Sequence, residues 1–460
     1  MTYEEWIPQL SENGDPIYRR IVSAIVDDIA QQRLRPGMRM PAHRELADQL
    51  NINVGTVTRA YTLAREMGLL SGEIGRGTFI NAPSPTEHAV DGGPAVIDLM
   101  INKPPALDDG ASLRKALSQI AEGFSVTQFL EYPPSNGQER HRLAATKLAQ
   151  MTGVEASVDQ VVLSNGAQQA LMAAVSSCVA PGGVLATEVL NYVGIRRLAE
   201  FLRLRIAAVA IDEHGMLPDS FERICRSEKV SVLVVTPSIH NPTTATLSLE
   251  RRREIVRIAG HYGVPIVEND IYGALIEKPD PALFTMAETP CWYICGLSKA
   301  VNSGIRVGYA IAPAESIGQA MSAIHASTWT VAPLMLEIAS QWIFDGTVAR
   351  MIAGHRVAVA ERQKLAKEIL GETSFHAHPQ SYHIWLPLPL RWRPHEFVEA
   401  CLKNGAAVTS GAHFQTSPSY VQNAVRVSLG AEPDIEVLRI GLERLRQTLQ
   451  APLSLDAMII

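Results

Sequence analysis

Short apolar runs alternate with helical patterns along most of the chain after residue 95. The runs are rich in Val, Ile and Leu, and each is three to five residues long. They occupy residues 161–163, 184–186, 206–210, 232–235, 265–267, 293–295 and 307–311. Because buried parallel strands show such continuous apolar runs, the alternation predicts an α/β domain with a largely parallel sheet and helices on both faces. Ligands of such folds bind outside the carboxyl ends of the strands.

The first eighty residues follow a different pattern. Apolar side chains recur at steps of three and four over residues 17–29, which predicts a helix, and Pro36 with Gly37 ends it. Two further helices are expected at residues 42–50 and 54–67. The inner face of the last one would carry Val57, Ala60, Tyr61 and Ala64. Two short strands around a glycine-rich tip then complete a unit of three helices and a hairpin.

Residues 81–94 contain three prolines and two glycines without helical or strand periodicity, so they are expected to form a linker. Such a segment reaches no more than roughly 50 Å when fully extended. We therefore expect a first domain at residues 1–80, a large α/β domain at 95–330 and a smaller α+β domain at 331–460.

The composition is that of a globular protein of two or three domains, with 460 residues, 47% of them hydrophobic and 19% charged. A net charge of −6 excludes a basic surface over the whole chain, so any signal for DNA binding must be local. The chain has no apolar run of the roughly 18 residues that span a bilayer and no signal peptide, which predicts a cytoplasmic protein without membrane contact. The five scattered cysteines favour buried thiols, and no metal site is expected.

All nine basic residues among the first eighty are arginines. A guanidinium fork binds phosphates and guanine edges bidentately, which an ammonium does not. Arg59 and Thr62 would project from the third helix away from its apolar face, where a recognition helix meets the major groove. A small helical interaction domain with solvated arginines explains this pattern equally well.

Four short segments of this unit resemble the winged helix-turn-helix of the GntR family. They are PAHRELA at 41–47, TVTRAY at 56–61, GLL at 68–70 and GRGTF at 75–79. The resemblance implies that residues of the helices and the wing contact double-stranded operator DNA. These residues are Arg44, Thr56, Arg59, Gly75, Arg76 and Gly77. The family often begins its recognition helix with Ser or Thr followed by Arg, where this chain has Asn53 and Val54, which leaves the identity of the operator bases open.

A candidate reactive group stands at Lys299, soon after the predicted strand at residues 293–295. Its ammonium would lie at a strand end close to the core, and partial desolvation lowers the pKa of an ammonium. A neutral amine condenses with aldehydes to form a Schiff base. Arg306, seven residues later, carries a donor fork suited to phosphate. Either residue alone would more often be an ordinary surface side chain beside a loop.

The segments GLSKA at 296–300 and GIRVGY at 304–309 resemble the lysine motif of the fold-type I pyridoxal phosphate enzymes, the aspartate aminotransferase family. The resemblance implies that Lys299 holds pyridoxal 5'-phosphate as a Schiff base and that Arg306 binds its phosphate. Many members have a hydroxyl residue where this chain has Gly296, so that phosphate contact is either missing or supplied by Ser298.

Two further turns fit the same family. Residues 164–169 follow a strand and open a helix, whose free N–H groups and dipole attract a phosphate, although many α/β loops look alike. The resemblance assigns this phosphate contact to Gly166, Ala167 and Gln168. Tyr192 could lie flat against an aromatic ring, and an ordinary half-buried loop tyrosine is its alternative. Asn241, in an Asn-Pro-Thr turn, would bond the phenolic oxygen of the cofactor.

Asp270 and Tyr272 follow another predicted strand. An Asp at such a place is more often a helix cap. In the aminotransferase family, a carboxylate at this position pairs with the pyridinium N–H of the cofactor and keeps it protonated, so that the ring can accept electrons. The resemblance assigns this role to Asp270. Tyr272 would bond the phenolic oxygen.

Two residues outside the predicted sheet complete the implied site. Tyr132 resembles the tyrosine that reaches the cofactor phosphate of the other subunit, which implies a homodimer. Arg426 resembles the arginine that binds the carboxylate of a substrate or effector bidentately, and an ordinary surface ion pair is its alternative.

A GntR-type domain joined to an aminotransferase-like domain resembles the MocR subgroup of bacterial regulators over nearly the whole chain. This implies a transcription regulator that holds pyridoxal phosphate and senses that cofactor or an amino compound. The alternative is a working pyridoxal phosphate-dependent aminotransferase with an appended DNA-binding domain, because only position 296 departs from the cofactor motifs.

Overall fold

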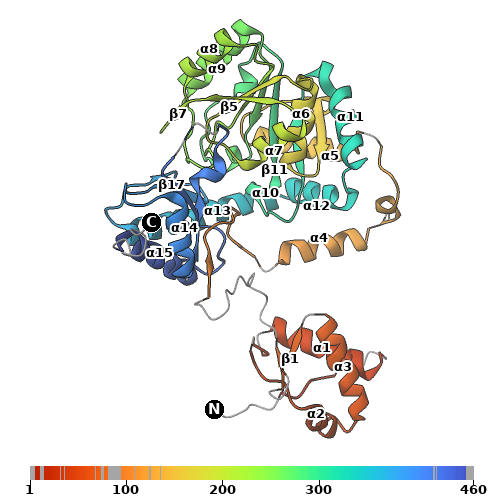
Figure 1. Ribbon diagram of the computed structural model, residues 1–460. Coiled ribbons are helices and arrows are strands. Elements are labelled where there is room, and N and C mark those ends of the chain that lie inside the picture. Colours follow the sequence, from red (N-terminus) through yellow and green to blue (C-terminus); the bar gives the residue numbers. More distant parts are fainter. Residues whose placement is uncertain are drawn as a thin grey trace. The chain divides into compact units, whose positions relative to one another are not determined.

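Figure 1 shows the computed structural model of the chain. It describes residues 6–10, 15–31, 33–35, 37–67, 69–73, 77–80, 95–108, 110–123, 126–134, 136–417, 420 and 422–451. The chain divides into two compact units, Met1–Ala89 and Val90–Ile460.

The first unit contains three helices and a hairpin in the predicted order. They are α1 (Ile17–Ala30), α2 (His43–Gln49), α3 (Val54–Glu66), β1 (Leu70–Glu73) and β2 (Gly77–Ile80), the strands being antiparallel. The four predicted core residues of α3 are fully buried. Asn53 caps α3, because its side chain accepts a hydrogen bond of 2.7 Å from the Gly55 N–H. A polar side chain therefore caps the start of α3.

All seven predicted strands occur in one sheet of the second unit. They are β4 (Val161–Ser164), β5 (Val184–Glu188), β6 (Arg205–Val209), β9 (Val232–Val235), β10 (Ile266–Asn269), β11 (Cys291–Gly296) and β12 (Gly308–Ile311). Their order across the sheet is β4-β12-β11-β10-β9-β5-β6. β12 is antiparallel to both of its neighbours, and the other pairings are parallel. The carboxyl ends of the parallel strands therefore meet at one edge.

Helices cover both faces of this sheet (Figure 1). Trp292 and Ile294 of β11 share a core with one set of helices, while Tyr293 points into the core on the opposite face. The first set is α6 (Ala167–Cys178), α7 (Val193–Phe201) and α11 (Ile317–Thr328). The opposite face carries α4 (Ala111–Ala121), α5 (Glu139–Gln150), α12 (Pro333–Phe344), α8 (Pro218–Ser227) and α9 (Leu249–Tyr262). Burial on both faces explains why these strands are apolar throughout.

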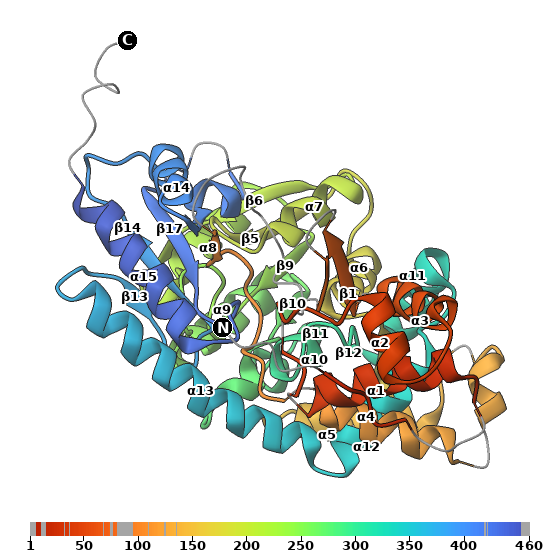
Figure 2. The same ribbon diagram turned by 90° about the horizontal axis from the view of Figure 1, so that it is seen from below.

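The C-terminal part of the second unit has a core of its own around a four-stranded sheet. The strands in order are β13 (His376–Ala377), β14 (His383–Pro387), β17 (Ala424–Ser428) and β16 (Thr409–Ser410). The helices are α13 (Thr347–Leu370), α14 (Pro394–Lys403) and α15 (Ile435–Gln450), which Figure 2 shows beside β14 and β17. Ile97 and Leu99 belong to the same core, because β3 (Ile97–Asp98) pairs in parallel with β15 (Ala406–Ala407). The beginning of the unit is thereby joined to its end.

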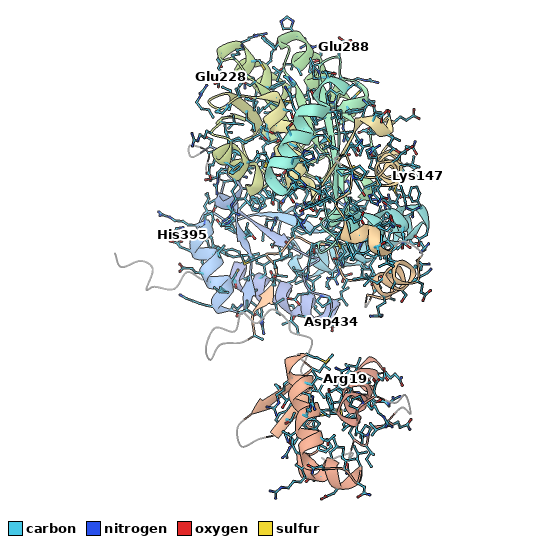
Figure 3. The ribbon with its side chains drawn as sticks, turned by 90° about the vertical axis from the view of Figure 1, so that its right-hand side faces the viewer. Arg19, Lys147, Glu228, Glu288, His395 and Asp434 are labelled. Atoms are coloured by element: carbon cyan, nitrogen blue, oxygen red, sulfur yellow. The ribbon has the colours of Figure 1, made fainter. Side chains whose placement is uncertain are left out.

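The remaining elements are short. They are α10 (Leu297–Ala300), the hairpin of β7 (Ile211–Asp212) and β8 (Gly215–Met216), and the 3-10 helices Val126–Leu130, Val158–Gln160, Gly273–Leu275, Leu283–Thr285, Ala314–Ser316 and Gly411–Phe414. Charged side chains such as Lys147, Glu288 and His395 project from the surface of this unit (Figure 3). Within the described ranges, no helix is long and apolar enough to cross a membrane, and no group of three or more His, Cys, Asp or Glu side chains is placed to bind a metal.

Candidate functional site

A cavity of about 400 Å³ lies in the second unit, at the carboxyl ends of the parallel strands. Nine of the residues predicted for the site line it. They are Ala167, Gln168, Tyr192, Asn241, Tyr272, Ser298, Lys299, Arg306 and Arg426. The tertiary structure therefore brings together motifs that lie up to 259 positions apart, from Ala167 to Arg426.

Three predicted residues do not line the cavity. Gly166 lies directly behind it, since a Cβ atom there would stand 3.0 Å from Arg306 Nη2. Asp270 is buried, and its neighbours in the sequence, Asn269 and Ile271, line the cavity. Tyr132 is 83% exposed, so its ring is available to a molecule outside this chain.

Lys299 sits in α10, which begins directly after β11. Its Nζ donates a hydrogen bond to the Asn102 carbonyl, and the Tyr382 hydroxyl donates to the Lys299 carbonyl over 2.7 Å. Burial lowers the pKa of Lys299 to about 7, and the nearby cations Arg426 and Arg306 add to this effect. A substantial fraction of neutral, nucleophilic amine is therefore present at neutral pH.

An anion-binding corner forms where the amino end of α6 meets Arg306. Gly166 caps α6 with a φ of 86°, a backbone conformation that favours glycine. A Cβ atom at Gly308 would stand 2.5 Å from the Gly166 carbonyl carbon, so β12 packs directly against this turn. Arg306 Nη1 lies 3.4 Å from Ser298 Oγ. The helix dipole, the free N–H groups and the guanidinium all favour a phosphate here.

Gly296 explains why the expected hydroxyl residue is missing from the lysine motif. A Cβ atom at this position would stand 2.9 Å from the Val307 carbonyl oxygen and 3.1 Å from Gly308 Cα. Both are backbone atoms, one in the residue before β12 and the other in the first residue of β12. No side chain fits beside them, whereas the hydroxyl residues Ser298 and Ser303 of the same region line the cavity.

The Asp270 carboxylate is held from behind. Its Oδ2 accepts a hydrogen bond of 2.9 Å from the Tyr293 hydroxyl, which lies 2.7 Å from Thr152 Oγ1. Asp270 Oδ1 is buried and has no partner within the described part of the chain. One carboxylate oxygen is thus fixed while the other keeps its capacity to accept a hydrogen bond.

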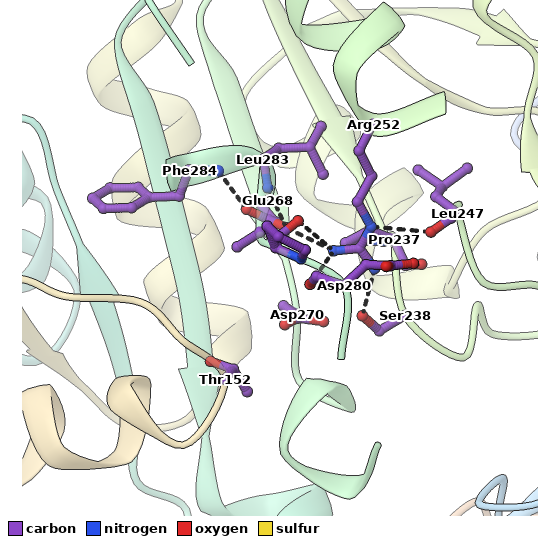
Figure 4. Close-up of polar contacts among 12 residues, drawn as sticks. Thr152, Pro237, Ser238, Leu247, Arg252, Glu268, Asp270, Asp280, Leu283 and Phe284 are labelled. Carbon is purple, nitrogen blue, oxygen red and sulfur yellow. Dashed lines mark hydrogen bonds and ion pairs between the residues drawn. The ribbon is translucent and has the colours of Figure 1, made fainter. Parts of the chain in front are cut away.

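The side chains of Glu268 and Arg252 are buried close to Asp270 (Figure 4). Burial, followed by the charge of Asp270, raises the pKa of Glu268 to about 8. Glu268 accepts hydrogen bonds from the N–H groups of Leu283 and Phe284, and Arg252 lies 3.9 Å away. Glu268 therefore holds a proton more readily than an ordinary glutamate, which limits the negative charge behind the cavity.

Arg426 lies on β17 and lines the same cavity. Its Nη1 donates to Asn241 Oδ1 over 3.0 Å, and its Nη2 donates to the Met100 carbonyl. The guanidinium carbon lies 4.9 Å from the centre of the Phe414 ring. Burial lowers the pKa of Arg426 to about 10, which still leaves it charged at neutral pH.

Several cavity residues escaped prediction. They are Met100, Ile101, Asn102, Asn191, Thr236, Asn269, Thr409, His413 and Phe414. Asn191 and Asn269 each adjoin a predicted residue, so sequence proximity could have identified them. Asn102 had no such signal, although its Nδ2 donates to the Tyr272 hydroxyl over 3.0 Å.

The charged groups of the cavity share one sign. Among the described residues that line it, Lys299, Arg306 and Arg426 are cationic and no carboxylate is present. A cavity of this kind suits a ligand with at least two negative groups.

The predicted DNA contacts lie on the surface of the first unit. Arg44 and Arg59 are exposed on α2 and α3, and Thr56 is half-buried. The Arg59 guanidinium lies 4.1 Å above the Tyr18 ring, which holds it against α1. Gly77 has a φ of 121° at the start of β2. Gly75 and Arg76, the predicted wing tip, lie outside the described residues.

Comparisons with known proteins match both halves of the chain. Residues 94–445 match the family described as aminotransferase class I and II, and residues 17–80 match the family of bacterial regulatory proteins, gntR family. The HTH-type transcriptional regulator YdeF of Bacillus subtilis is 30% identical over 450 residues, which cover 96% of each chain. The vitamin B6 salvage pathway transcriptional repressor PtsJ of Salmonella typhimurium is 25% identical over 91% of this chain and 95% of its own.

Solved structures share the fold of the second unit. The α-aminoadipate aminotransferase LysN of Thermus thermophilus has a TM-score of 0.70 at 21% identity, covering 77% of this chain and 92% of its own. An archaeal alanine:glyoxylate aminotransferase has a TM-score of 0.71 at 23% identity, covering 78% of this chain and 91% of its own. At this identity the likeness concerns the fold.

Proposed function

Because the chain belongs to the aminotransferase class I and II family and carries a gntR-family domain ahead of it, we propose that it is a MocR-type transcription regulator that binds operator DNA and holds pyridoxal phosphate on Lys299. The observation that carries this proposal is the single cavity shared by Lys299, Arg306 and Arg426. Its charge and its volume suit a phosphorylated aldehyde together with a carboxylate.

The residues present fit this cofactor. Lys299 offers an amine with a lowered pKa, and the corner of Gly166, Ser298 and Arg306 offers donors for a phosphate. We assign the phosphate contacts of the loop also to Ala167 and Gln168. Gly194 leaves room for the Tyr192 ring, because a Cβ atom there would stand 2.2 Å from it. The ring can therefore lie against a flat ligand.

We assign the hydrogen bonds to the polar groups of the cofactor ring to three side chains. Asn241 and Tyr272 would bond the phenolic oxygen, and the unpartnered oxygen of Asp270 would accept from the pyridinium N–H. When bound, pyridoxal phosphate supplies an aldehyde that exchanges Lys299 for an incoming amine. The effector is therefore the cofactor itself or an amino compound, with Arg426 as the site for a carboxylate. The name of PtsJ, a vitamin B6 salvage repressor, supports this class of effector.

A homodimer is the assembly that we propose. Tyr132 and Leu130 are 83% and 85% exposed, and both precede α5 on a surface segment. Burial of such side chains against a second copy would bring Tyr132 to the phosphate site of the partner. Operator binding places the working protein in the cytoplasm, with DNA as its macromolecular partner.

The cofactor is tested with a visible spectrum of the purified protein supplied with pyridoxal phosphate. We expect an absorption band, and borohydride should then attach the cofactor to the peptide that contains Lys299. Lys299→Ala should lose both, whereas Lys147→Ala, a change at an exposed lysine of α5, should keep both. A protein that takes up no cofactor under these conditions contradicts the proposal.

The regulatory role is tested with an operator selected from random-sequence DNA. Its affinity should differ between protein alone, protein with pyridoxal phosphate and protein with added amines, because only a ligand that prefers one state shifts an equilibrium. Equal affinity in all three cases would refute sensing. Turnover of amino donors at about 1 to 1000 per second would instead favour a working aminotransferase.

A further inference from the structure

Two buried polar residues outside the recognised motifs, Asn102 and His383, contact the hydroxyl side of Tyr272. Asn102 lines the cavity and is 8% exposed, and His383 is fully buried at the start of β14. Asn102 Nδ2 donates to the Tyr272 hydroxyl over 3.0 Å and lies 3.1 Å from His383 Nδ1. One amide group therefore joins the segment after β3, the turn after β10 and the first residue of β14.

The His383 ring accepts a hydrogen bond from this amide. An amide nitrogen only donates, so His383 Nδ1 is the unprotonated nitrogen of the ring. Burial lowers the pKa of His383 well below its ordinary value, which keeps the ring neutral at neutral pH. Ser381 Oγ lies 3.2 Å from Nδ1 but donates its proton to the His383 carbonyl over 2.8 Å. The Asn102 amide thus uses one N–H group on His383 and the other on Tyr272.

This arrangement decides the direction in which the Tyr272 hydroxyl donates. Burial raises the pKa of Tyr272, so the hydroxyl keeps its proton. Because its oxygen accepts from Asn102, that proton is free for a ligand in the cavity. An amide turned over by half a rotation would instead accept the Tyr272 proton. His383 opposes this rotation, since the amide oxygen would then face the lone pair of Nδ1.

We propose that Asn102 and His383 are positioning residues, which fix the Tyr272 hydroxyl as a hydrogen-bond donor to the phenolic oxygen of bound pyridoxal phosphate. This inference rests on the proposed function, which assigns Tyr272 to that oxygen. The phenolic oxygen shares a proton with the nitrogen of the Schiff base at Lys299. Once this proton leaves, the oxygen carries a full negative charge, which a donor stabilises. The pair therefore lowers the pH at which the visible band of the bound cofactor changes.

A double-mutant cycle in the full-length protein loaded with pyridoxal phosphate tests this role. Asn102→Ala removes the amide but keeps the backbone carbonyl that accepts from Lys299. The pH midpoint of the visible band should rise by about one unit, the equivalent of one hydrogen bond. Tyr272→Phe should raise the midpoint at least as much. In the Tyr272→Phe protein, Asn102→Ala should add no further shift, because the amide acts through the hydroxyl.

Two substitutions of His383 supply a matched pair. His383→Asn keeps a side-chain acceptor for the Asn102 amide, whereas His383→Leu fills a similar volume without one. His383→Leu should raise the midpoint as Asn102→Ala does, and His383→Asn should stay close to the wild type. All these substitutions exchange one neutral side chain for another, so the cationic groups of the cavity are the same in every variant. Thermal unfolding identifies any variant that has lost its fold.

The outcomes separate this inference from the proposed function. If the protein takes up the cofactor and Asn102→Ala leaves the midpoint unchanged, or shifts it equally with and without the Tyr272 hydroxyl, the positioning role is refuted and the cofactor site stands. A common midpoint for two folded His383 variants refutes the part assigned to His383. If the wild-type protein gives no visible band with pyridoxal phosphate, the proposed function fails and this inference fails with it.

Discussion

At the scale of single residues, the chemistry depends on the charge of one amine. Lys299 shares the cavity wall with two guanidinium groups, and the described residues that line the cavity include no carboxylate. Burial is the larger cause that disfavours its charged form, and repulsion by the two guanidinium groups is the smaller one. The fold lowers its pKa from 10.5 to about 7. The neutral form therefore prevails above this pH and the charged form below it.

The rate of cofactor uptake should follow that titration. Below pH 7 the rate of appearance of the visible band should fall by about tenfold for each pH unit, because only the neutral amine attacks an aldehyde. Above this value it should level off. Stopped-flow absorbance across the pH range measures the profile. Arg426→Gln removes one of the repelling cations and should move the midpoint upward, and a midpoint near the ordinary lysine value in the wild-type protein would contradict the account.

At the scale of elements, the phosphate corner depends on the close contact between β12 and the turn before α6. Two backbones meet at Gly308 and Gly166 with no room for a Cβ atom between them. The antiparallel direction of β12 places Gly308 opposite Ser164, the last residue of β4 before this turn. The shape of the anion site is thus set by strand pairing as much as by the loop itself.

Gly308→Ala should disturb this corner. Its Cβ atom would stand 2.6 Å from the Ala167 nitrogen, so the turn must shift, at a cost of about 1 to 3 kcal/mol of stability. The affinity for pyridoxal phosphate should fall together with the thermal stability. Gly318→Ala in α11, where no atom lies within 4 Å, is the control and should keep both. Full cofactor affinity in Gly308→Ala would show that the contact is unimportant.

At the scale of the whole molecule, two compact units carry separable functions. The first unit presents exposed arginines on α2 and α3, and the second carries a cationic cavity. Each unit has its own hydrophobic core, so a substitution on the surface of one unit leaves the packing of the other intact. Damage to DNA binding and damage to cofactor binding should therefore be separable by mutation.

Arg59→Ala and Lys299→Ala should have opposite effects. Arg59→Ala should weaken DNA binding and reduce the slope of log affinity against log salt by about one if Arg59 contacts a phosphate. It should leave the visible band unchanged. Lys299→Ala should abolish the band while the protein still binds DNA. Arg226→Ala, an exposed arginine of the second unit, serves as control in gel-shift titrations and should match the wild type. Loss of the band in Arg59→Ala would contradict the separation.

The sequence alone determined the order of helices and strands and the motifs around Lys299. Helical and strand periodicity and turn motifs are local properties, so they can be recognised within some twenty residues. This is why all seven strands of the large sheet and the three helices of the first unit were predicted close to their observed bounds. Asp270 shows the limit of such reasoning, because the hydrogen bond that holds one of its carboxylate oxygens comes from Tyr293 on a neighbouring strand.

Only the tertiary structure decided which backbone carbonyls accept hydrogen bonds from Lys299 and Arg426. The carbonyls of Asn102 and Met100 reach them from 197 and 326 positions away along the chain. Every residue has a backbone carbonyl, so a contact made by one leaves no mark in the side-chain pattern. The pairing of β3 with β15 brings residues 98–102 to the cavity, and a parallel pairing between the two ends of a unit is a long-range event that no local pattern encodes.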